Sequence, residues 1–355
     1  MKHSEQVLKL LRKQIGNDSE VQEIRRTAQE VVKKWINPLS GGVEETNGLV
    51  YGLVQSGKTG VLSVKEGDIR NVSPLRLRRE LNLQKGELDL LAGCPPCQGF
   101  SSLRTRNGNK RNRDRRNDLV GQMLRFAKAF EPRAIMMENV PKLIQYGPFK
   151  RLCQELSDLG YDVDVQVKDA ARYGVPQRRR RLILLAGKGF PIQAAAEARV
   201  VRTVRSAIGD LKEAGKSKDA LHDLPEKRRS ERVEQLIRDI PKDGGSRTDL
   251  SEDRQLPCHQ KSDGFRDIYG RMAWDEVSPT ITGGCFNPSK GRFLHPVKNR
   301  AITMREAALL QTFPKRYRFS QRAGKEAIAL MIGNALPPEF IRRHALVILK
   351  TLQSG

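Results

Sequence analysis

Apolar residues recur along most of the chain in the blocks and spacings that mark packed secondary structure. Near the start, residues 4–15 and 20–36 carry apolar positions three or four apart, which predicts two amphipathic helices. The stretch 37–48 contains Pro, Gly and Asn, and it predicts a loop. Farther on, short apolar or alternating runs predict strands, and longer amphipathic stretches predict helices between them. The predicted strands are 88–93, 134–138, 161–167 and 181–187, and the predicted helices between them are 119–130 and 148–160.

Strands that alternate with helices predict an α/β fold with a doubly wound, mostly parallel sheet. Residues 190–275 break this alternation, because they are rich in Arg, Lys, Asp and Gly and hold one helical pattern at 230–240. We therefore expect a second, smaller domain there. Two more helices are predicted at 305–313 and 338–352. The predicted divisions are 1–65 (a helical segment and a glycine loop), 66–189 (the α/β domain), 190–300 (the smaller domain) and 301–355 (a segment that packs back on the α/β domain).

The charge balance points to a polyanionic partner. Lys and Arg number 65 against 41 Asp and Glu, a net charge of +24 over 355 residues. Nucleic acid is the first candidate for such a chain, and a ribosome or membrane-surface binder is the alternative. No apolar run reaches the roughly 18 residues of a membrane span. The charged N-terminus lacks the apolar core of a signal peptide, so we expect a cytoplasmic protein.

The five cysteines form an odd, scattered set. This pattern disfavours a disulfide framework and favours a reducing compartment. Cys94 and Cys97 form a single C-x-x-C pair without a second pair at zinc-site spacing, so we expect no metal.

A glycine loop near the N-terminus predicts phosphate binding. Gly57, Lys58 and Thr59 complete a G-x-x-x-x-G-K-[ST] motif, in which backbone N–H groups cradle phosphates and the Lys reaches the terminal ones. Residues 48–62 resemble the opening of a restriction-associated P-loop ATPase family. The residues that follow do not read as the required helix, and no acidic strand end stands at suitable spacing.

Chemically informative residues follow the predicted strands, where the sites of doubly wound sheets lie. Cys97 falls in 92-AGCPPCQGFSS-102, Glu138 ends the next strand, and Gln177, Arg179 and Arg181 open another. With 305-REAALLQTFP-314 and 333-GNALPP-338, these motifs resemble, in order, those of the DNA (cytosine-5) methyltransferase family over about residues 66–355.

The resemblance implies transfer of a methyl group from S-adenosylmethionine to carbon 5 of a flipped cytosine in double-stranded DNA. It assigns Cys97 to attack carbon 6 of the base, because the unactivated ring is too weak a nucleophile. Glu138 would donate a hydrogen bond or proton at ring nitrogen 3, and Arg179 and Arg181 would orient the base and the carboxylate. The implied cofactor contacts are Asp68, Ile69, Leu119 and Asn334.

The resemblance also implies two DNA-contacting regions. The basic stretch 104–116 has seven Lys or Arg among thirteen residues, a composition suited to a mobile loop that closes over phosphates. The smaller domain would read bases, with Thr280 and Ile281 as its signature pair. The implied DNA contacts are Gln98, Ser101, Arg104, Arg106, Thr280 and Ile281. Flipping the base costs a few kcal/mol.

The family's cofactor-binding start is missing from the expected place. No Phe-x-Gly-x-Gly turn stands upstream of Asp68, where two strand–helix units would occupy about 50–60 residues. We therefore expect a methyltransferase-type fold without its first strand–helix units, and a complementing chain that supplies them. Three interpretations stay open: a methyltransferase in a restriction-modification context, a DNA-binding remnant that transfers nothing, and an ATP-dependent DNA enzyme that uses Lys58.

Overall fold

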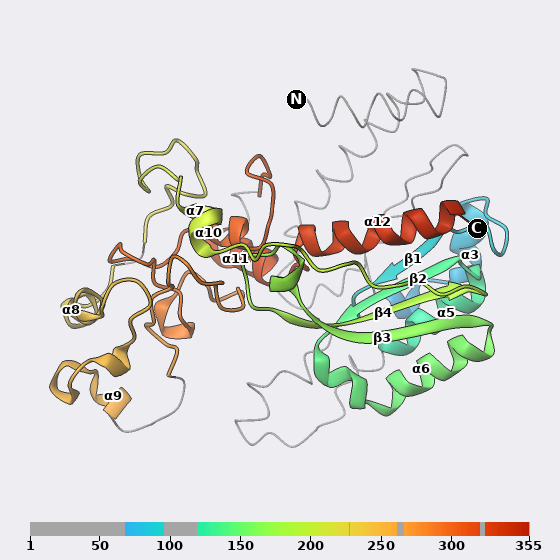
Figure 1. Ribbon diagram of the computed structural model, residues 1–355, viewed down its shortest axis with the longest axis horizontal. Helices are drawn as coiled ribbons and strands as arrows, with labels where there is room; N and C mark the ends of the chain where they lie inside the picture. The colour runs from blue at the N-terminus through green and yellow to red at the C-terminus, as the bar shows by residue number, and fades with distance from the viewer. Residues whose placement is uncertain (1–67, 96–118, 227, 261–265, 320–323, 355) are drawn as a thin grey trace. The chain divides into compact units, whose positions relative to one another are not determined.

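The computed structural model describes residues 68–95, 119–226, 228–260, 266–319 and 324–354 (Figure 1). The predicted N-terminal helices, the glycine loop and the basic stretch 104–116 lie outside these residues. The chain forms two compact units. The first comprises Met1–Lys168, Arg180–Ala194 and Leu346–Gly355, and the second comprises Asp169–Arg179 and Ala195–Ala345. The predicted domain boundaries stay a prediction, because compactness alone does not assign separate roles.

The first unit is built on a four-stranded sheet in the order β1-β2-β4-β3. Its strands are β1 (Leu90–Gly93), β2 (Ala134–Asn139), β3 (Tyr161–Asp169) and β4 (Arg180–Lys188). β1 and β2 are parallel, with Leu90 opposite Ala134, whereas β2 and β4 are antiparallel, with Ala134 opposite Gly187. The described part of the sheet is therefore mixed, and the prediction of a mostly parallel sheet is wrong for it. All four predicted strands are confirmed to within two residues at each end.

The helices of this unit follow from local sequence signals. The first are η1 (Ile69–Asn71) and α3 (Pro74–Glu80), which Ser73 caps by accepting a hydrogen bond from the Arg76 N–H. α5 (Val120–Phe130) buries Met123, Phe126 and Phe130, which lie three or four residues apart on one face. η4 (Pro141–Gln145) and α6 (Gly147–Asp158) complete the set. α5 and α6 confirm the two helices predicted between the strands.

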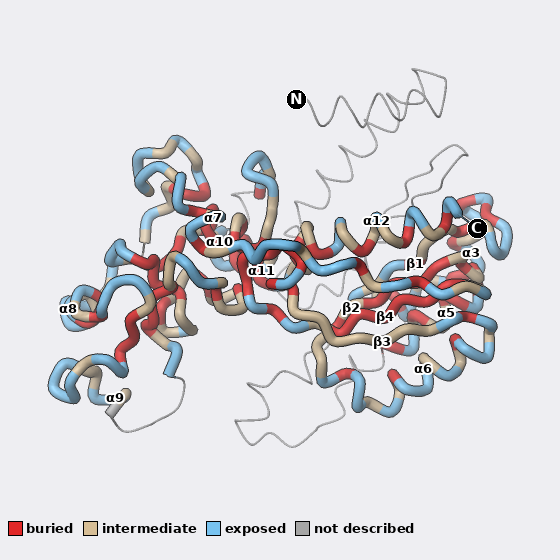
Figure 2. The backbone as a smooth tube through the Cα atoms, in the orientation of Figure 1, coloured by how far each residue is buried: buried red, intermediate tan, exposed pale blue. Residues whose placement is uncertain are grey.

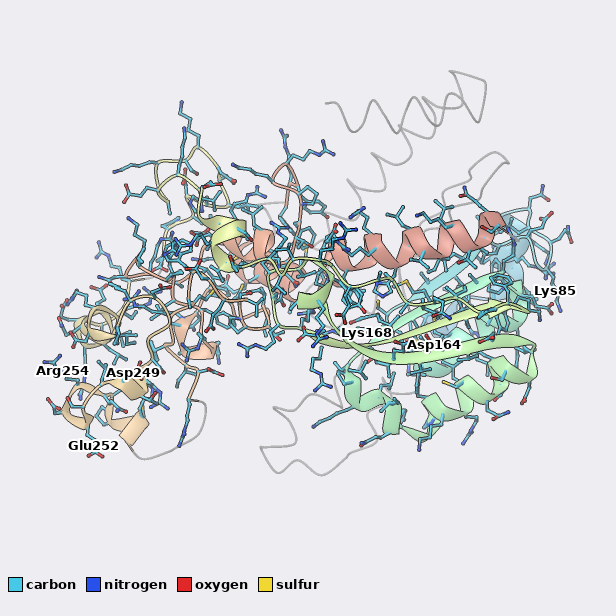
Figure 3. The ribbon with its side chains drawn as sticks, viewed as in Figure 1. Lys85, Asp164, Lys168, Asp249, Glu252 and Arg254 are labelled. Carbon is cyan, nitrogen blue, oxygen red and sulfur yellow. The ribbon has the colours of Figure 1, made fainter. Side chains whose placement is uncertain are left out.

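The core of the first unit lies along the inner strands. The side chains of β2 from Ala134 to Met137 and of β4 from Leu182 to Ala186 are buried (Figure 2). β3 lies at one edge of the sheet and carries charged residues, among them Asp164 and Lys168 (Figure 3). Such charges discourage another chain from pairing with an edge strand.

The second unit has short helices and long connections. Its elements are η5 (Ala170–Tyr173), α7 (Val204–Ile208), α8 (Glu231–Asp239), η6 (Arg247–Asp249), η7 (Glu252–Arg254), α9 (Pro257–Gln260), η8 (Pro288–Lys290), α10 (Met304–Leu310) and α11 (Gly324–Asn334). Thr303 and Glu306 form a reciprocal capping box that starts α10. The last helix, α12 (Pro338–Ser354), begins in this unit and ends in the first. α8, α10 and α12 confirm the helices predicted at 230–240, 305–313 and 338–352. Among the described helices, none is long and apolar enough to cross a membrane.

Candidate functional site

A nearly buried ion pair stands at the carboxyl end of β2. The Arg181 Nε lies 2.7 Å from the Glu138 Oε1, and the two side chains are 15% and 12% exposed. The antiparallel pairing of β2 and β4 explains the contact, because it sets the start of β4 beside the end of β2, with Asn139 opposite Leu182. The sheet thus holds a carboxylate and a guanidinium together at the edge where the sequence predicts chemistry.

The same edge holds the beginning of the cysteine turn. The Asn139 side-chain amide donates a 2.9 Å hydrogen bond to the Pro95 carbonyl, just beyond the end of β1. The Asn139 amide oxygen in turn accepts from the Val140 N–H at 2.8 Å. Cys97 lies outside the described residues and follows Pro95 by two positions in the sequence. The chain that leads to Cys97 is therefore tied to the residue next to Glu138.

Cys94 is a second thiol near Glu138. It keeps an exposed surface, yet surrounding protein atoms partly desolvate its sulfur, and the Glu138 carboxylate lies close to it. Desolvation first, and then the negative charge of Glu138, raise the pKa of the Cys94 thiol. A raised pKa disfavours the thiolate form of Cys94, and Cys97 stays the predicted nucleophile.

Three of the four predicted cofactor residues lie in the first unit. Asp68 caps η1 by accepting a 2.9 Å hydrogen bond from the Arg70 N–H, and the Arg70 guanidinium also binds its carboxylate. The hydrogen bonds from Arg70 lower the pKa of Asp68. Ile69 and Leu119 are buried in one apolar cluster. A carboxylate oxygen is an acceptor of the kind that an adenine amino group requires, and the predicted contact of these residues with the adenosine part of S-adenosylmethionine stays a prediction.

Arg179 lies in the second unit, where its guanidinium is buried against backbone carbonyls. It donates to the oxygens of Ile281 at 3.1 Å, Gly333 at 3.0 Å and Ala335 at 3.2 Å. Its own N–H donates to the Asp169 carboxylate at 3.0 Å. The three guanidinium contacts given above are to backbone carbonyls, and the expectation that Arg179 orients the base stays a prediction.

Two buried glutamines extend this set of contacts. The Gln177 amide nitrogen donates to the Gln311 side-chain oxygen at 2.8 Å, and the Ile281 N–H donates to the Gln177 side-chain oxygen at 2.9 Å. The Gln311 amide nitrogen donates to the carbonyls of Ile332 at 2.6 Å and Ala335 at 3.2 Å. Fragments of four sequence motifs thus meet within one unit.

The remaining predicted residues of the second unit border this network. The Thr280 hydroxyl donates to the Arg178 carbonyl at 2.7 Å, and Ile281 is fully buried. Asn334 is exposed at the last position of α11. The Ile281 side chain packs in the apolar core of this unit, whereas the Asn334 side chain is exposed. The predicted DNA contacts of Thr280 and Ile281 and the predicted cofactor contact of Asn334 stay predictions.

Sequence reasoning missed three contributors: Asn139, Gln311 and Gly333. Each lies within one of the motifs that carry the family resemblance: Asn139 in the motif of Glu138, Gln311 in 305–314 and Gly333 in 333–338. Membership in these motifs was the signal that could have identified them. A Cβ added at Gly333 would lie 2.2 Å from the Thr282 carbonyl carbon and 2.3 Å from the Gly283 nitrogen. Only glycine leaves room for this approach of two backbones.

Eight of the predicted site residues lie outside the described residues, and their roles stay predictions. They are Cys97, Gln98, Ser101, Arg104 and Arg106 of the first region, and Gly57, Lys58 and Thr59 of the glycine loop.

Comparison with known proteins decides the family. The model of the C-5 cytosine-specific DNA methylase family matches residues 56–350. The chain belongs to this family. It is 33% identical over 330 residues to the Type II methylase M.HgiDII of Herpetosiphon aurantiacus, covering 88% of this chain and 89% of that one. It is 31% identical over 298 residues to the Type II methyltransferase M1.HphI of Haemophilus parahaemolyticus, covering 81% and 74%.

A solved structure supports the fold. The crystal structure of a protein described as a DNA modification methyltransferase encoded within a prophage (E. coli) matches with a TM-score of 0.56 at 22% identity, covering 83% of this chain and 87% of that one. The C-5 cytosine-specific DNA methylases use S-adenosylmethionine as methyl donor, so the enzyme class and the cofactor follow from membership. The family match includes Gly57, Lys58 and Thr59, and nothing in the comparisons supports the P-loop resemblance.

Proposed function

We propose that this chain methylates carbon 5 of a flipped cytosine in duplex DNA through a covalent Cys97 adduct, in a restriction-modification context. One observation carries the proposal: Glu138 and Arg181 form a nearly buried pair 2.7 Å apart, at the sheet edge where Asn139 holds the start of the Cys97 turn. A nucleophile, a carboxyl group and a cation are what addition to a cytosine ring requires.

The reaction balances as an addition followed by an elimination. The Cys97 thiolate adds to carbon 6, and the electron pair of the 5,6 double bond makes carbon 5 nucleophilic. When bound, S-adenosylmethionine supplies an electrophilic methyl group to that carbon. A base then removes the proton of carbon 5, the double bond re-forms, and the thiolate leaves. Glu138, in its protonated form, donates a hydrogen bond or a proton to ring nitrogen 3 and so compensates the negative charge that builds up on the ring during addition, while Arg181 orients its carboxyl group.

The ligands are assigned to residues as follows. Asp68, Ile69, Leu119 and Asn334 would contact the cofactor. Gln98, Ser101, Arg104, Arg106, Thr280 and Ile281 would contact DNA, to which the net charge of +24 draws the chain. The absence of a recognisable Phe-x-Gly-x-Gly turn supports a complementing chain that completes the cofactor site.

A mechanism-based trap detects the covalent adduct after a single methyl transfer and does not require multiple turnovers. Duplex DNA in which cytosine is replaced by 5-fluorocytosine is incubated with the protein and S-adenosylmethionine, with and without host extract. Fluorine cannot leave as a proton does, so the adduct persists after methyl transfer. We expect a denaturant-resistant protein–DNA complex with the wild-type chain and with Lys58→Ala, and none with Cys97→Ser.

Each other outcome identifies a different error. A complex that survives in Cys97→Ser contradicts the assigned nucleophile. Loss of the complex in Lys58→Ala alone favours an ATP-dependent enzyme. DNA binding without any complex, even with extract, favours a binding remnant.

A further inference from the structure

The strand register brings Cys94 beside Glu138 at one end of the sheet. β1 and β2 are neighbours, and their parallel pairing sets Gly93 opposite Met137 (Figure 1). The next residue along each strand is Cys94 on one side and Glu138 on the other. Residues that lie opposite each other in neighbouring strands project from the same face of a sheet, so the thiol and the carboxyl group share a face.

Arg181 reaches the same group from the other side of β2. Glu138 lies opposite Ile183 of β4. Arg181 and Ile183 are two residues apart, and alternate residues of a strand project from the same face. The Arg181 Nε accordingly lies 2.7 Å from the Glu138 Oε1. The Glu138 side chain is therefore flanked by a thiol from β1's end and a guanidinium from β4.

The Cys94 thiol contacts both the backbone and the side chain of Glu138. Its S–H donates a hydrogen bond to the Glu138 carboxylate, and its sulfur accepts one from the Glu138 backbone N–H. The neighbouring residues are joined as well, because the Asn139 amide donates to the Pro95 carbonyl at 2.9 Å. Residues 94 and 95 are thus tied to residues 138 and 139 beyond the last residue pair of β1 and β2.

A carboxyl group that handles a proton at a bound ring must be held in one orientation, since a displacement of about 1 Å can cost about 10²-fold in rate. One donor fixes one oxygen of the group, whereas a second donor from another strand also fixes its plane. A thiol is a weak donor. It therefore orients the carboxyl group without favouring the charged form as strongly as a second cation would.

We propose that Cys94 is a positioning residue that, together with Arg181, orients the carboxyl group of Glu138 toward the reacting base. The inference rests on the proposed function for the identity of that base. It gives a role to the first cysteine of the C-x-x-C pair, which is distinct from the predicted nucleophile Cys97.

Steady-state methyl transfer tests this role with two variants of Cys94. Initial rates are measured at saturating labelled S-adenosylmethionine and varied mixed-sequence duplex, with host extract in every reaction and the rate of extract alone subtracted. Cys94→Ala removes the donor, so kcat should fall by about tenfold while KM for DNA stays within about twofold. Cys94→Ser keeps a donor in nearly the same place, so its kcat should stay within about threefold of wild type.

The matched control is Cys153→Ala. Cys153 is a half-buried thiol of α6 that packs against the apolar core of the same unit. Its removal should lower the melting temperature and leave kcat unchanged. A loss of rate that came from lower stability alone would therefore appear in both alanine variants.

The contact between Cys94 and Glu138 can be measured without methyl transfer. The negative charge of Glu138 opposes ionisation of the Cys94 thiol, and the thiolate is the form that reacts with iodoacetamide. In a Cys97→Ser chain at mildly alkaline pH, Glu138→Gln should therefore speed alkylation of Cys94 by about threefold or more. Alkylation of Cys153, followed in its own peptide by mass spectrometry, should keep its rate.

Four results would overturn the inference: wild-type kcat in Cys94→Ala, a Cys94→Ser chain as slow as Cys94→Ala, an equal loss of kcat in Cys153→Ala, and alkylation of Cys94 at the same rate with and without the Glu138 charge. A wild-type chain that transfers no methyl group would instead contradict the proposed function. The alkylation rates then decide alone whether Cys94 and Glu138 are in contact.

Discussion

Removing Arg181 should cost stability as well as activity, and the two effects can be separated. Arg181→Met leaves the Glu138 carboxylate, which is only 12% exposed, without its partner. Breaking a buried pair costs about 3–5 kcal/mol. Because both side chains keep some contact with water, we take the lower end, about 3 kcal/mol. For a unit of this size, that lowers the melting temperature by roughly 6–12 °C.

The matched variants are Glu138→Gln and the double variant Glu138→Gln/Arg181→Met. The double variant contains neither charge, so it should recover most of the stability, and the double-mutant cycle should give a coupling energy of about 2–3 kcal/mol. Activity should not recover. All three variants should transfer methyl groups about 10²- to 10⁴-fold more slowly, because a group that handles a proton or its hydrogen bond is lost or misplaced.

The assays are urea unfolding of the purified chain and initial rates of labelled methyl transfer. Single effects on stability that add to within about 0.5 kcal/mol would refute the ion pair as a stabilising unit. A double variant with wild-type rates would refute the role of Glu138 in the reaction.

Three other predictions follow from the structure. Gly333→Ala should destabilise the chain by about 1–3 kcal/mol, because the added Cβ would lie 2.2 Å from the Thr282 carbonyl carbon. The control Gly121→Ala, in α5, should stabilise the chain by about 0.5–1 kcal/mol, because no atom lies within 4 Å of the added Cβ. Thermal melts that rank the two variants the other way would contradict this packing. Burial lowers the pKa of His295 from 6.5 to about 4, and its Nδ1 accepts hydrogen bonds from two backbone N–H groups. Because the unfolded chain binds the proton more readily, the stability that neutral His295 contributes is complete above pH 6.5 and is lost as the pH falls. The free energy of unfolding should decrease by about 2 kcal/mol by pH 5. Urea unfolding at pH 7 and pH 5 should show a smaller loss in His295→Asn than in wild type, and equal losses would count against the shift. DNA affinity should fall steeply with salt in filter-binding titrations, and an affinity independent of salt would contradict the electrostatic basis of binding.

Much of the fold could be read from the sequence because its strands and helices have strong local patterns. The apolar runs predicted β2 and β4, and the apolar stripe predicted α5, each to within two residues of its ends. The direction of β4 could not be read, because a fully buried strand has the same pattern whether its neighbour is parallel or antiparallel. That direction is what brings Arg181 to Glu138.

The candidate site was predictable in its residue types and unpredictable in its contacts. Glu138 and Arg181 are 43 residues apart, and only the sheet register pairs them. Arg179 and Arg181 look equivalent in the motif, yet Arg181 meets a carboxylate and Arg179 meets carbonyls. Such differences depend on long-range packing, which a single sequence does not encode in any local pattern.

The central claim is tested most directly by finding where a labelled methyl group goes. The purified chain is incubated with methyl-labelled S-adenosylmethionine and mixed-sequence duplex DNA, alone and with host extract, and the DNA is digested to nucleosides. The account predicts label in 5-methyl-2′-deoxycytidine from the wild-type chain and none from Cys97→Ser, with a rate that rises when extract supplies a complementing chain. Label on an exocyclic nitrogen, or no label in either reaction while DNA and cofactor both bind, would contradict it.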